Sequence, residues 1–150
     1  MFDRYYDEIE VGDRRQFRGV TITEAHVVGF AGLVGDHNSL HVDAEFAKAS
    51  RFGQRIAHGF LVLSASSGLF PQEPGRVIAF YGMDEVRFTA PTFIGDTIRC
   101  DHEVIGKRDK PRGGVVSIRQ TLTNQRDEVV CVATLHVLAD VSPGRVGEGS

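Results

Sequence analysis

One segment, residues Phe60–Phe70, is apolar or small at every position and is followed by Pro71. A helix without a polar face has to be buried. At about eleven residues the segment is far shorter than the roughly 20 residues that a membrane span requires, so the protein itself must cover it. We expect a β-sheet to supply this cover.

The second half of the chain supplies the expected sheet. Four segments, residues 77–89, 97–104, 116–122 and 129–139, alternate between apolar and polar side chains with the period of two that is typical of strands, and a fifth strand is expected near 15–20. Short connections between consecutive strands favour antiparallel pairing. The pattern therefore predicts an α+β fold in which a curved antiparallel five-stranded sheet wraps around one central apolar helix.

Connections and shorter helices complete the expected domain. Thr23 is a candidate N-cap for a helix over residues 24–34, and residues 44–50 are expected to form a short second helix. The charged, glycine-rich stretch 106–114 is expected to be a mobile connection. Residues 1–141 are predicted to form a single domain, with residues 142–150 as a flexible C-terminal tail.

Charge and composition limit the classes of function. A net charge of −3 without a run of Lys or Arg argues against nucleic-acid binding, and no apolar run is long enough to span a membrane. The start of the chain carries acidic residues where a signal peptide would carry basic ones, so we expect a cytoplasmic protein. Cys100 and Cys131 each lie in a strand-like segment and are expected to be buried free thiols, with a disulfide as the alternative.

The loop from Gly35 to His41 is the first candidate for chemistry. It contains Asp36, Asn38 and His41 among residues that favour turns, and a turn can bring the carboxylate and the imidazole to one point. Such a pair could hold and deprotonate a water molecule. An Asx-turn with exposed histidines explains the same residues equally well. A metal site built from Asp36, His41 and His58 is a third interpretation.

The second candidate is the pair His58-Gly59, which directly precedes the apolar helix. Backbone amides at a helix N-terminus favour developing negative charge, and a glycine lets a carbonyl group come close. Alternatively, Gly59 only relieves crowding at the helix entrance. Hydroxyl groups on the helix, Ser64, Ser66 and Ser67, are expected to bond to their own backbone, although one of them could orient Asp36. Since no phosphate loop or nucleophile motif is present, we expect acid–base chemistry without a metal or cofactor.

Three stretches of the chain resemble the MaoC-like dehydratases, the R-specific enoyl-CoA hydratases. The family signature is a G-D-x-N-P-hydrophobic-H loop, followed by a phenylalanine-glycine stretch and a histidine-glycine pair that opens the central helix. Residues 30–43 and 51–60 carry its two parts, and residues 86–97 are similar to the segment that enters the third strand. Ser39 departs from the pattern, because the family usually has proline there, which would stiffen the turn.

The resemblance implies a hot-dog fold that pairs into a dimer with thioester sites at the subunit interface. By motif position it implies that Asp36 and His41 form the catalytic pair and that Gly59 donates to the thioester carbonyl. Asn38 would order the water or the loop, while Ser67 would support Asp36. We group His58 with these supporting and substrate-binding residues.

The resulting expectation is reversible hydration of a trans-2-enoyl-CoA to an (R)-3-hydroxyacyl-CoA. The expected partners are an acyl thioester of coenzyme A or of an acyl carrier protein, and further copies of the chain in a homodimer or a dimer of dimers. Two alternatives remain, namely a hot-dog thioesterase and a non-catalytic acyl-thioester-binding subunit of a larger dehydratase. The basic residues of the 106–114 stretch are expected to form a solvated turn rather than a coenzyme A site.

Overall fold

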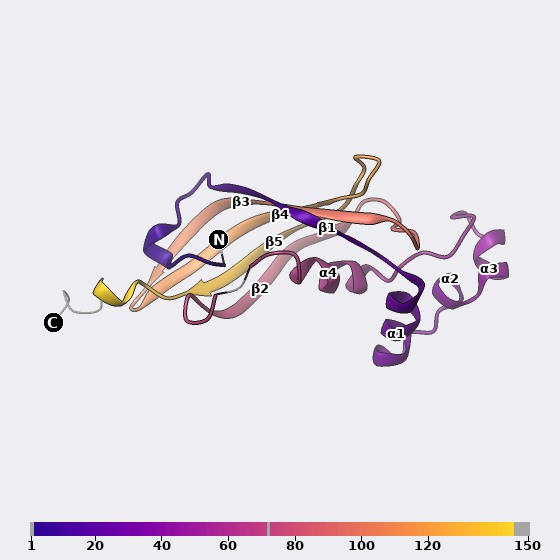
Figure 1. Ribbon diagram of the computed structural model, residues 1–150, viewed down its shortest axis with the longest axis horizontal. Coiled ribbons are helices and arrows are strands. Elements are labelled where there is room, and N and C mark those ends of the chain that lie inside the picture. Colours follow the sequence, from indigo (N-terminus) through magenta and orange to yellow (C-terminus); the bar gives the residue numbers. More distant parts are fainter. Residues whose placement is uncertain (1, 72, 146–150) are drawn as a thin grey trace.

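A computed structural model describes residues 2–71 and 73–145 of the chain, and an antiparallel five-stranded sheet forms most of it (Figure 1). The strands follow the spatial order β1-β3-β4-β5-β2. Their bounds are β1 Arg14–Thr21, β2 Val77–Phe88, β3 Thr97–Lys110, β4 Gly113–Thr123 and β5 Val129–Ala139. The helices are η1 Tyr6–Glu8, α1 Glu24–Val34, α2 Ser39–Val42, α3 Ala44–Ala49, α4 Gly59–Ser67 and η2 Pro143–Arg145. The predicted strands and the α+β class are therefore confirmed.

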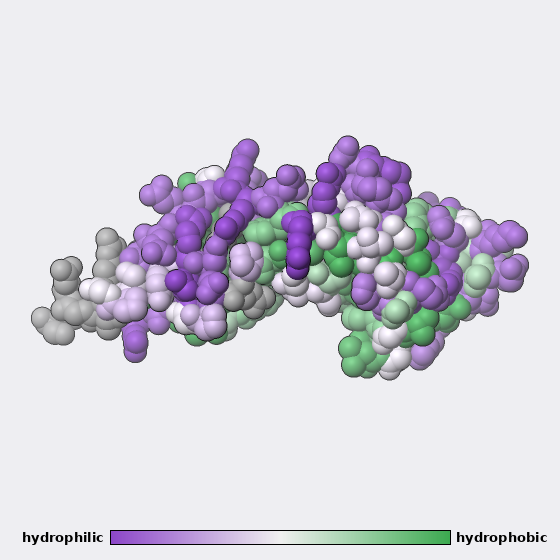
Figure 2. Space-filling model, in the orientation of Figure 1, coloured by the Kyte–Doolittle hydropathy of each residue, from purple (hydrophilic) through white to green (hydrophobic). Residues whose placement is uncertain are grey.

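The sheet arches over α4, and α1, α2 and α3 gather at one end of the molecule (Figure 1). In β3, buried residues alternate with partly exposed ones, so that Ile98, Cys100, His102 and Val104 face the core as the sequence predicts. Hydrophilic side chains gather over the outer side of the sheet in the view of Figure 2. The period of two thus gives the sheet one apolar and one polar face.

Two clusters of buried apolar side chains form the core. The first includes Leu61 and Val62 of α4 together with Leu122 of β4, and the second includes Val116 and Ile118 of β4. Along the inward face of β4, the buried Gln120 lies between Ile118 and Leu122. A polar position therefore separates the apolar positions of this strand.

The apolar helix is shorter and more exposed than its sequence predicts. It begins at Gly59 and ends at Ser67, because Gly68 serves as its C-cap. Leu61, Val62 and Ser66 are buried, whereas Phe60 is 72% exposed. The expectation of burial all round was wrong for the single chain, because the sheet covers only one side of α4.

The charged stretch 106–114 also differs from its prediction. Residues up to Lys110 continue β3, and β4 begins at Gly113, so the two strands form a tight hairpin in place of a mobile connection. The Lys107 ammonium group donates to the backbone carbonyls of Tyr6 and Ile9 at 2.7 and 2.6 Å. The hairpin is therefore held by its ladder and by the N-terminal segment.

The predicted cap of α1 and the two predicted free thiols are confirmed. Thr23 caps α1, since its side chain accepts from the His26 N–H, and Cys100 and Cys131 are free and buried. Within the expected tail, Ser142 donates to the Asp7 carboxylate, while residues 146–150 lie outside the described residues. None of the described helices has the length and apolar character needed to cross a membrane.

Candidate active site

The candidate loop starts where α1 ends. Gly35 adopts a left-handed conformation with φ of 76°, and its N–H donates to the Ala31 carbonyl at 2.9 Å. Glycine takes this conformation without the steric cost that a side chain would add, and it is the usual residue at this position after a helix. The chain therefore turns sharply, and Asp36 is the first residue beyond the turn.

The turn itself is built by the side chains of Asp36 and Asn38. Asp36 Oδ1 accepts from the Asn38 N–H at 3.2 Å, and Asn38 Oδ1 accepts from the Leu40 N–H at 2.9 Å, which caps α2. The Asx-turn itself is therefore confirmed, but the expectation that both histidines are exposed holds for His37 and not for His41, whose side chain is 13% exposed. The turn uses only one oxygen of Asp36. Ser39 occupies the first position of α2, a position where proline is favoured. The Asn38 cap forms with serine at that position.

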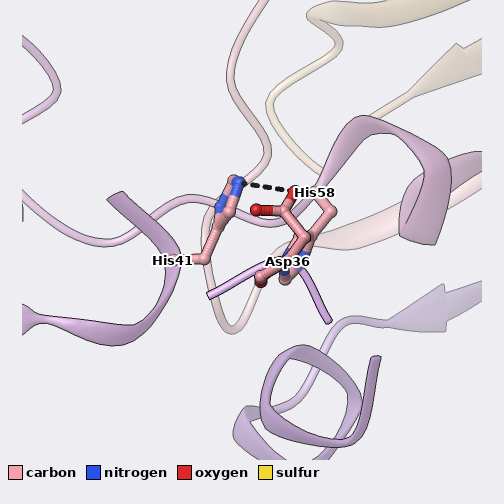
Figure 3. A group of neighbouring side chains, drawn as sticks. All are labelled: Asp36, His41 and His58. Carbon is pink, nitrogen blue, oxygen red and sulfur yellow. Dashed lines mark hydrogen bonds and ion pairs between the residues drawn. The ribbon is translucent and has the colours of Figure 1, made fainter. Parts of the chain in front are cut away.

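His41 faces the second oxygen of Asp36. The distance between His41 Nε2 and Asp36 Oδ2 is 4.0 Å, and Figure 3 shows the carboxylate and the imidazole turned toward one another. His41 Nδ1 lies 2.8 Å from the Ile56 carbonyl, which can only accept a hydrogen bond. Nδ1 therefore carries the proton in the neutral ring, and the lone pair of Nε2 points toward Asp36.

His58 lies behind this pair. Its ring stacks on the His41 ring with centroids 3.8 Å apart, and its Nε2 donates to the backbone carbonyl of Asp36 at 3.0 Å. His58 is 3% exposed, and in the described part of the chain its Nδ1 has no hydrogen-bond partner. His58 therefore holds the Asp36 backbone through a hydrogen bond and the His41 ring through stacking.

Gly59 opens α4 beside His41. Among the described residues, no hydrogen bond from the Gly59 N–H is found, as expected for the first residue of a helix. A Cβ at this position would lie 2.6 Å from the Phe88 ring, so the close approach of that ring requires glycine. Crowding therefore does explain Gly59, and the unpaired N–H remains available as a donor.

A cavity of about 630 Å³ opens at these residues. Its walls include His41, Gly59, Phe60 and Phe88, together with Phe52 and Thr92 from neighbouring segments. A base and a backbone donor therefore reach the same space. The sequence did not predict the roles of Phe88 and of the Ile56 carbonyl. Phe88 meets Gly59 only in the folded chain, and a backbone carbonyl can belong to any residue type, so neither forms a sequence motif.

Ser67 lies at the opposite end of α4. A helical rise of 1.5 Å per residue separates it from Gly59 by roughly 12 Å, and its hydroxyl donates to the Ser64 carbonyl. Ser66 similarly donates to Leu63. The fold of the single chain therefore does not place Ser67 beside Asp36. The expectation that these hydroxyl groups bond to the backbone of their own helix is confirmed for Ser66 and Ser67.

The metal interpretation can be compared with the same geometry. One potential ligand atom from each of Asp36, His41 and His58 lies within 4.8 Å of the others. The two imidazole rings, however, stack with an angle of 30° between their planes. Nitrogen lone pairs lie in the ring plane, so stacked rings do not aim two lone pairs at one ion. The geometry suits acid–base chemistry better than metal binding.

Comparison with known proteins identifies the family. The family model for the MaoC like domain matches residues 8–126. The chain is 46% identical over 99 residues to protein MaoC of Klebsiella aerogenes, a match that covers 65% of this chain and 30% of that protein. It is 37% identical over 105 residues to an (R)-specific enoyl-CoA hydratase of Aeromonas caviae, with 69% of this chain and 77% of the relative covered. The chain thus spans less than a third of the Klebsiella protein.

Solved structures agree with this assignment. A structure from Archaeoglobus fulgidus, described as a monoamine oxidase regulatory protein, has a TM-score of 0.88 at 38% identity and covers 94% of this chain and 97% of its own. A Mycobacterium tuberculosis protein with a double hot-dog fold has a TM-score of 0.83 at 23% identity, covers 95% of this chain and 46% of its own, and bears on the fold alone. The chain therefore has a hot-dog fold and belongs to the MaoC-like dehydratase domain family.

Proposed function

We propose that this protein is a hydro-lyase that adds water to a trans-2-enoyl thioester of coenzyme A. The observation that carries the proposal is the meeting of His41 Nε2 and Asp36 Oδ2 at 4.0 Å beside a cavity that the start of α4 also lines. This distance is too long for a direct hydrogen bond and leaves room for a bridging water. The relative from Aeromonas caviae is named an (R)-specific enoyl-CoA hydratase, which supports an (R)-3-hydroxyacyl product.

In the proposed reaction, one water molecule lies between Asp36 and His41. The lone pair on His41 Nε2 accepts a proton as the water oxygen bonds to the β-carbon of the enoyl group. The π electrons move to the thioester oxygen, where the Gly59 N–H stabilises the resulting enolate. The α-carbon then takes this proton from His41 Nε2, on the same face as the β-carbon took oxygen, so the base is restored and one water molecule is added overall.

The acid–base pair and the backbone donor at Gly59 are expected to supply most of the rate enhancement. General acid–base assistance contributes about 10²–10⁴-fold, and loss of one oxyanion donor typically costs about 2.7–4 kcal/mol. The Ile56 carbonyl fixes the ring tautomer that such a base requires. The stacked His58 ring and the Asn38 turn hold the two side chains in position.

We also propose that two copies of the chain pair through the uncovered side of α4 and the edge strand β2. Apolar side chains gather there, since Phe60 is 72% exposed and Phe80 of β2 is 58% exposed. Ile78, Tyr81 and Phe88 of the same strand are also more than 45% exposed. Contiguous apolar surface of this kind favours association. Sedimentation velocity with wild type and Phe80→Asp tests this pairing, and a monomeric wild type would contradict it.

The activity test follows the loss of the conjugated enoyl-thioester absorbance. Asp36→Asn and His41→Ala are expected to lower kcat/KM by about 10²–10⁴-fold, because each removes one part of the acid–base pair. His37→Gln is the matched control, since His37 is exposed in the same loop. Equal rates in wild type and both site variants would overturn the proposal.

The same samples separate the alternatives. Release of free thiol, detected with a thiol-trapping reagent, would identify a thioesterase in place of a hydratase. Tight binding of an enoyl-CoA without loss of absorbance would identify a binding subunit. Either result would contradict the proposed hydration.

A further inference from the structure

A second cavity, of about 470 Å³, lies along the outer part of α4. Phe60 lines both this cavity and the one at His41, so the two spaces meet at one side chain. The second cavity is mainly apolar, and its walls include Leu63, Phe70, Phe80 and Leu135. Its position suits the acyl group of a thioester whose carbonyl lies at Gly59.

Gln120 is the polar side chain that the sheet contributes to this apolar cavity. It is 2% exposed, and two donors converge on its Oε1, namely His102 Nε2 at 2.9 Å and the Cys100 thiol at 3.5 Å. Within residues 2–71 and 73–145, no hydrogen bond from the Gln120 amide NH₂ group is found. Because Gln120 lines the cavity, this NH₂ group is a donor that a bound oxygen atom can reach. Ser64, Ser66 and Ser67 of α4 also line the cavity, and the hydroxyl groups of Ser66 and Ser67 already donate to the backbone carbonyls of Leu63 and Ser64.

The surroundings of Gln120 and His102 are mainly aromatic and apolar. The rings of Phe2, Phe17 and Phe70 lie around His102, with centroids between 5.0 and 5.7 Å from its imidazole. Within the described residues, His102 Nδ1 is also buried without a hydrogen-bond partner. An oxygen on the bound acyl group would give the Gln120 NH₂ group a hydrogen-bond acceptor in these apolar surroundings.

The lack of charged side chains in the described lining of the cavity favours a neutral oxygen on the acyl group over a charged one. Among the described residues that line the cavity there is no Lys, Arg, Asp or Glu. His102 is neutral near pH 7, since burial lowers its pKa to about 4. A carboxylate in such a space would lose its hydration without gaining a cationic partner. A hydroxyl or keto oxygen carries no charge and can accept from the Gln120 amide NH₂ group.

We propose that the second cavity selects acyl groups that carry a neutral hydroxyl or keto oxygen along the chain, which the Gln120 amide NH₂ group binds. This inference rests on the proposed function, because it assigns the cavity to the acyl group of the same thioester. Gln120 then determines specificity, whereas Asp36 and His41 perform the hydration.

The test uses binding, so that it does not depend on turnover. Octanoyl-CoA and a series of saturated oxo-octanoyl-CoA isomers, with the keto group at successive carbons, are titrated by calorimetry. At least one isomer is expected to bind roughly threefold to tenfold more tightly than octanoyl-CoA, as a neutral hydrogen bond implies. Gln120→Leu is expected to remove this preference while retaining binding of octanoyl-CoA.

Two further variants keep the result interpretable. Met83→Leu changes an apolar wall of the same cavity at nearly constant volume and is expected to preserve the preference. Gln120→Leu with His102→Leu replaces both polar partners and serves if the single variant fails to fold. The proposal is wrong if no isomer binds more tightly than octanoyl-CoA, or if the preference survives loss of Gln120. A preference without hydration would overturn only the catalytic proposal.

Discussion

Lowering the pH from about 7.5 to about 5 is expected to destabilise the fold through His102. Its side chain is 2% exposed, and burial lowers its pKa from 6.5 to about 4, although the bond to Gln120 opposes the shift. A depressed pKa means that the unfolded chain takes up the proton first. The stabilisation is therefore present above pH 6.5 and is lost as the pH falls toward 4.

The magnitude follows from the two pKa values. A shift of this size corresponds to about 3 kcal/mol in full, of which about 2 kcal/mol is lost by pH 5. The carboxyl groups whose pKa values are lowered, such as Asp96 and Glu128, have ordinary values of 3.8 and 4.5 and change protonation at lower pH. Protonation of these carboxyl groups therefore contributes little to the loss of stability between pH 6.5 and 5.

Urea unfolding followed by far-ultraviolet circular dichroism measures this loss, and the chain has no Trp for a fluorescence assay. His102→Leu with Gln120→Leu is expected to flatten the pH dependence between 7.5 and 5, because both polar partners are replaced. His37→Gln, at an exposed histidine, is expected to retain the wild-type slope. If the double variant lost as much stability as wild type over this range, the reasoning about His102 would be refuted.

Three further predictions concern single sites. Gly59→Ala is expected to lower the stability by about 1–3 kcal/mol in thermal unfolding, because the added Cβ would lie 2.6 Å from the Phe88 ring. In a chain that already carries Phe88→Ala, the same substitution should cost much less. An equal loss of stability with and without the Phe88 ring would contradict this prediction. Asp96→Asn is expected to lower the free energy of unfolding in urea by about 2–3 kcal/mol, since the buried carboxylate accepts from Arg126, Gln125 and the Phe93 N–H. A loss smaller than that of an exposed ion pair would argue against this prediction. Burial raises the thiol pKa to about 12 for Cys100 and about 11 for Cys131, so a thiol reagent at pH 8 should label neither until urea unfolds the protein.

The sequence predicted the strands well because one wet and one dry face impose an alternation that can be read directly. It predicted the 106–114 stretch poorly, because charged residues usually favour solvent. In the structure, pairing with β4 and the contacts of Lys107 with the N-terminal segment outweigh that preference. The end of α4 was also misplaced, since composition alone did not distinguish the Gly68 cap from a helical glycine.

At the site, the loop was predictable and its surroundings were not. The Asp36 and His41 spacing, together with turn-forming residues, correctly indicated a close approach of the two side chains. The Ile56 carbonyl that orients His41 lies in another segment of the chain, so no local pattern could reveal it. Gln120 reads in the sequence as an ordinary inward position of β4, and only the assembled core shows its polar neighbours.

The division of the core affects how the molecule fluctuates. Phe2 and Tyr6 of the N-terminal segment belong to the second apolar cluster, while α4 contributes Leu61 and Val62 to the first. Elements with separate contacts open as separate cooperative units with different free energies. Phe2 stacks on Phe70, which packs against both clusters, so this ring pair is the contact that must break before the N-terminal segment opens alone. We expect that opening to require less free energy than the opening of α4. Amide hydrogen exchange would then show weaker protection around Tyr6 than around Val62.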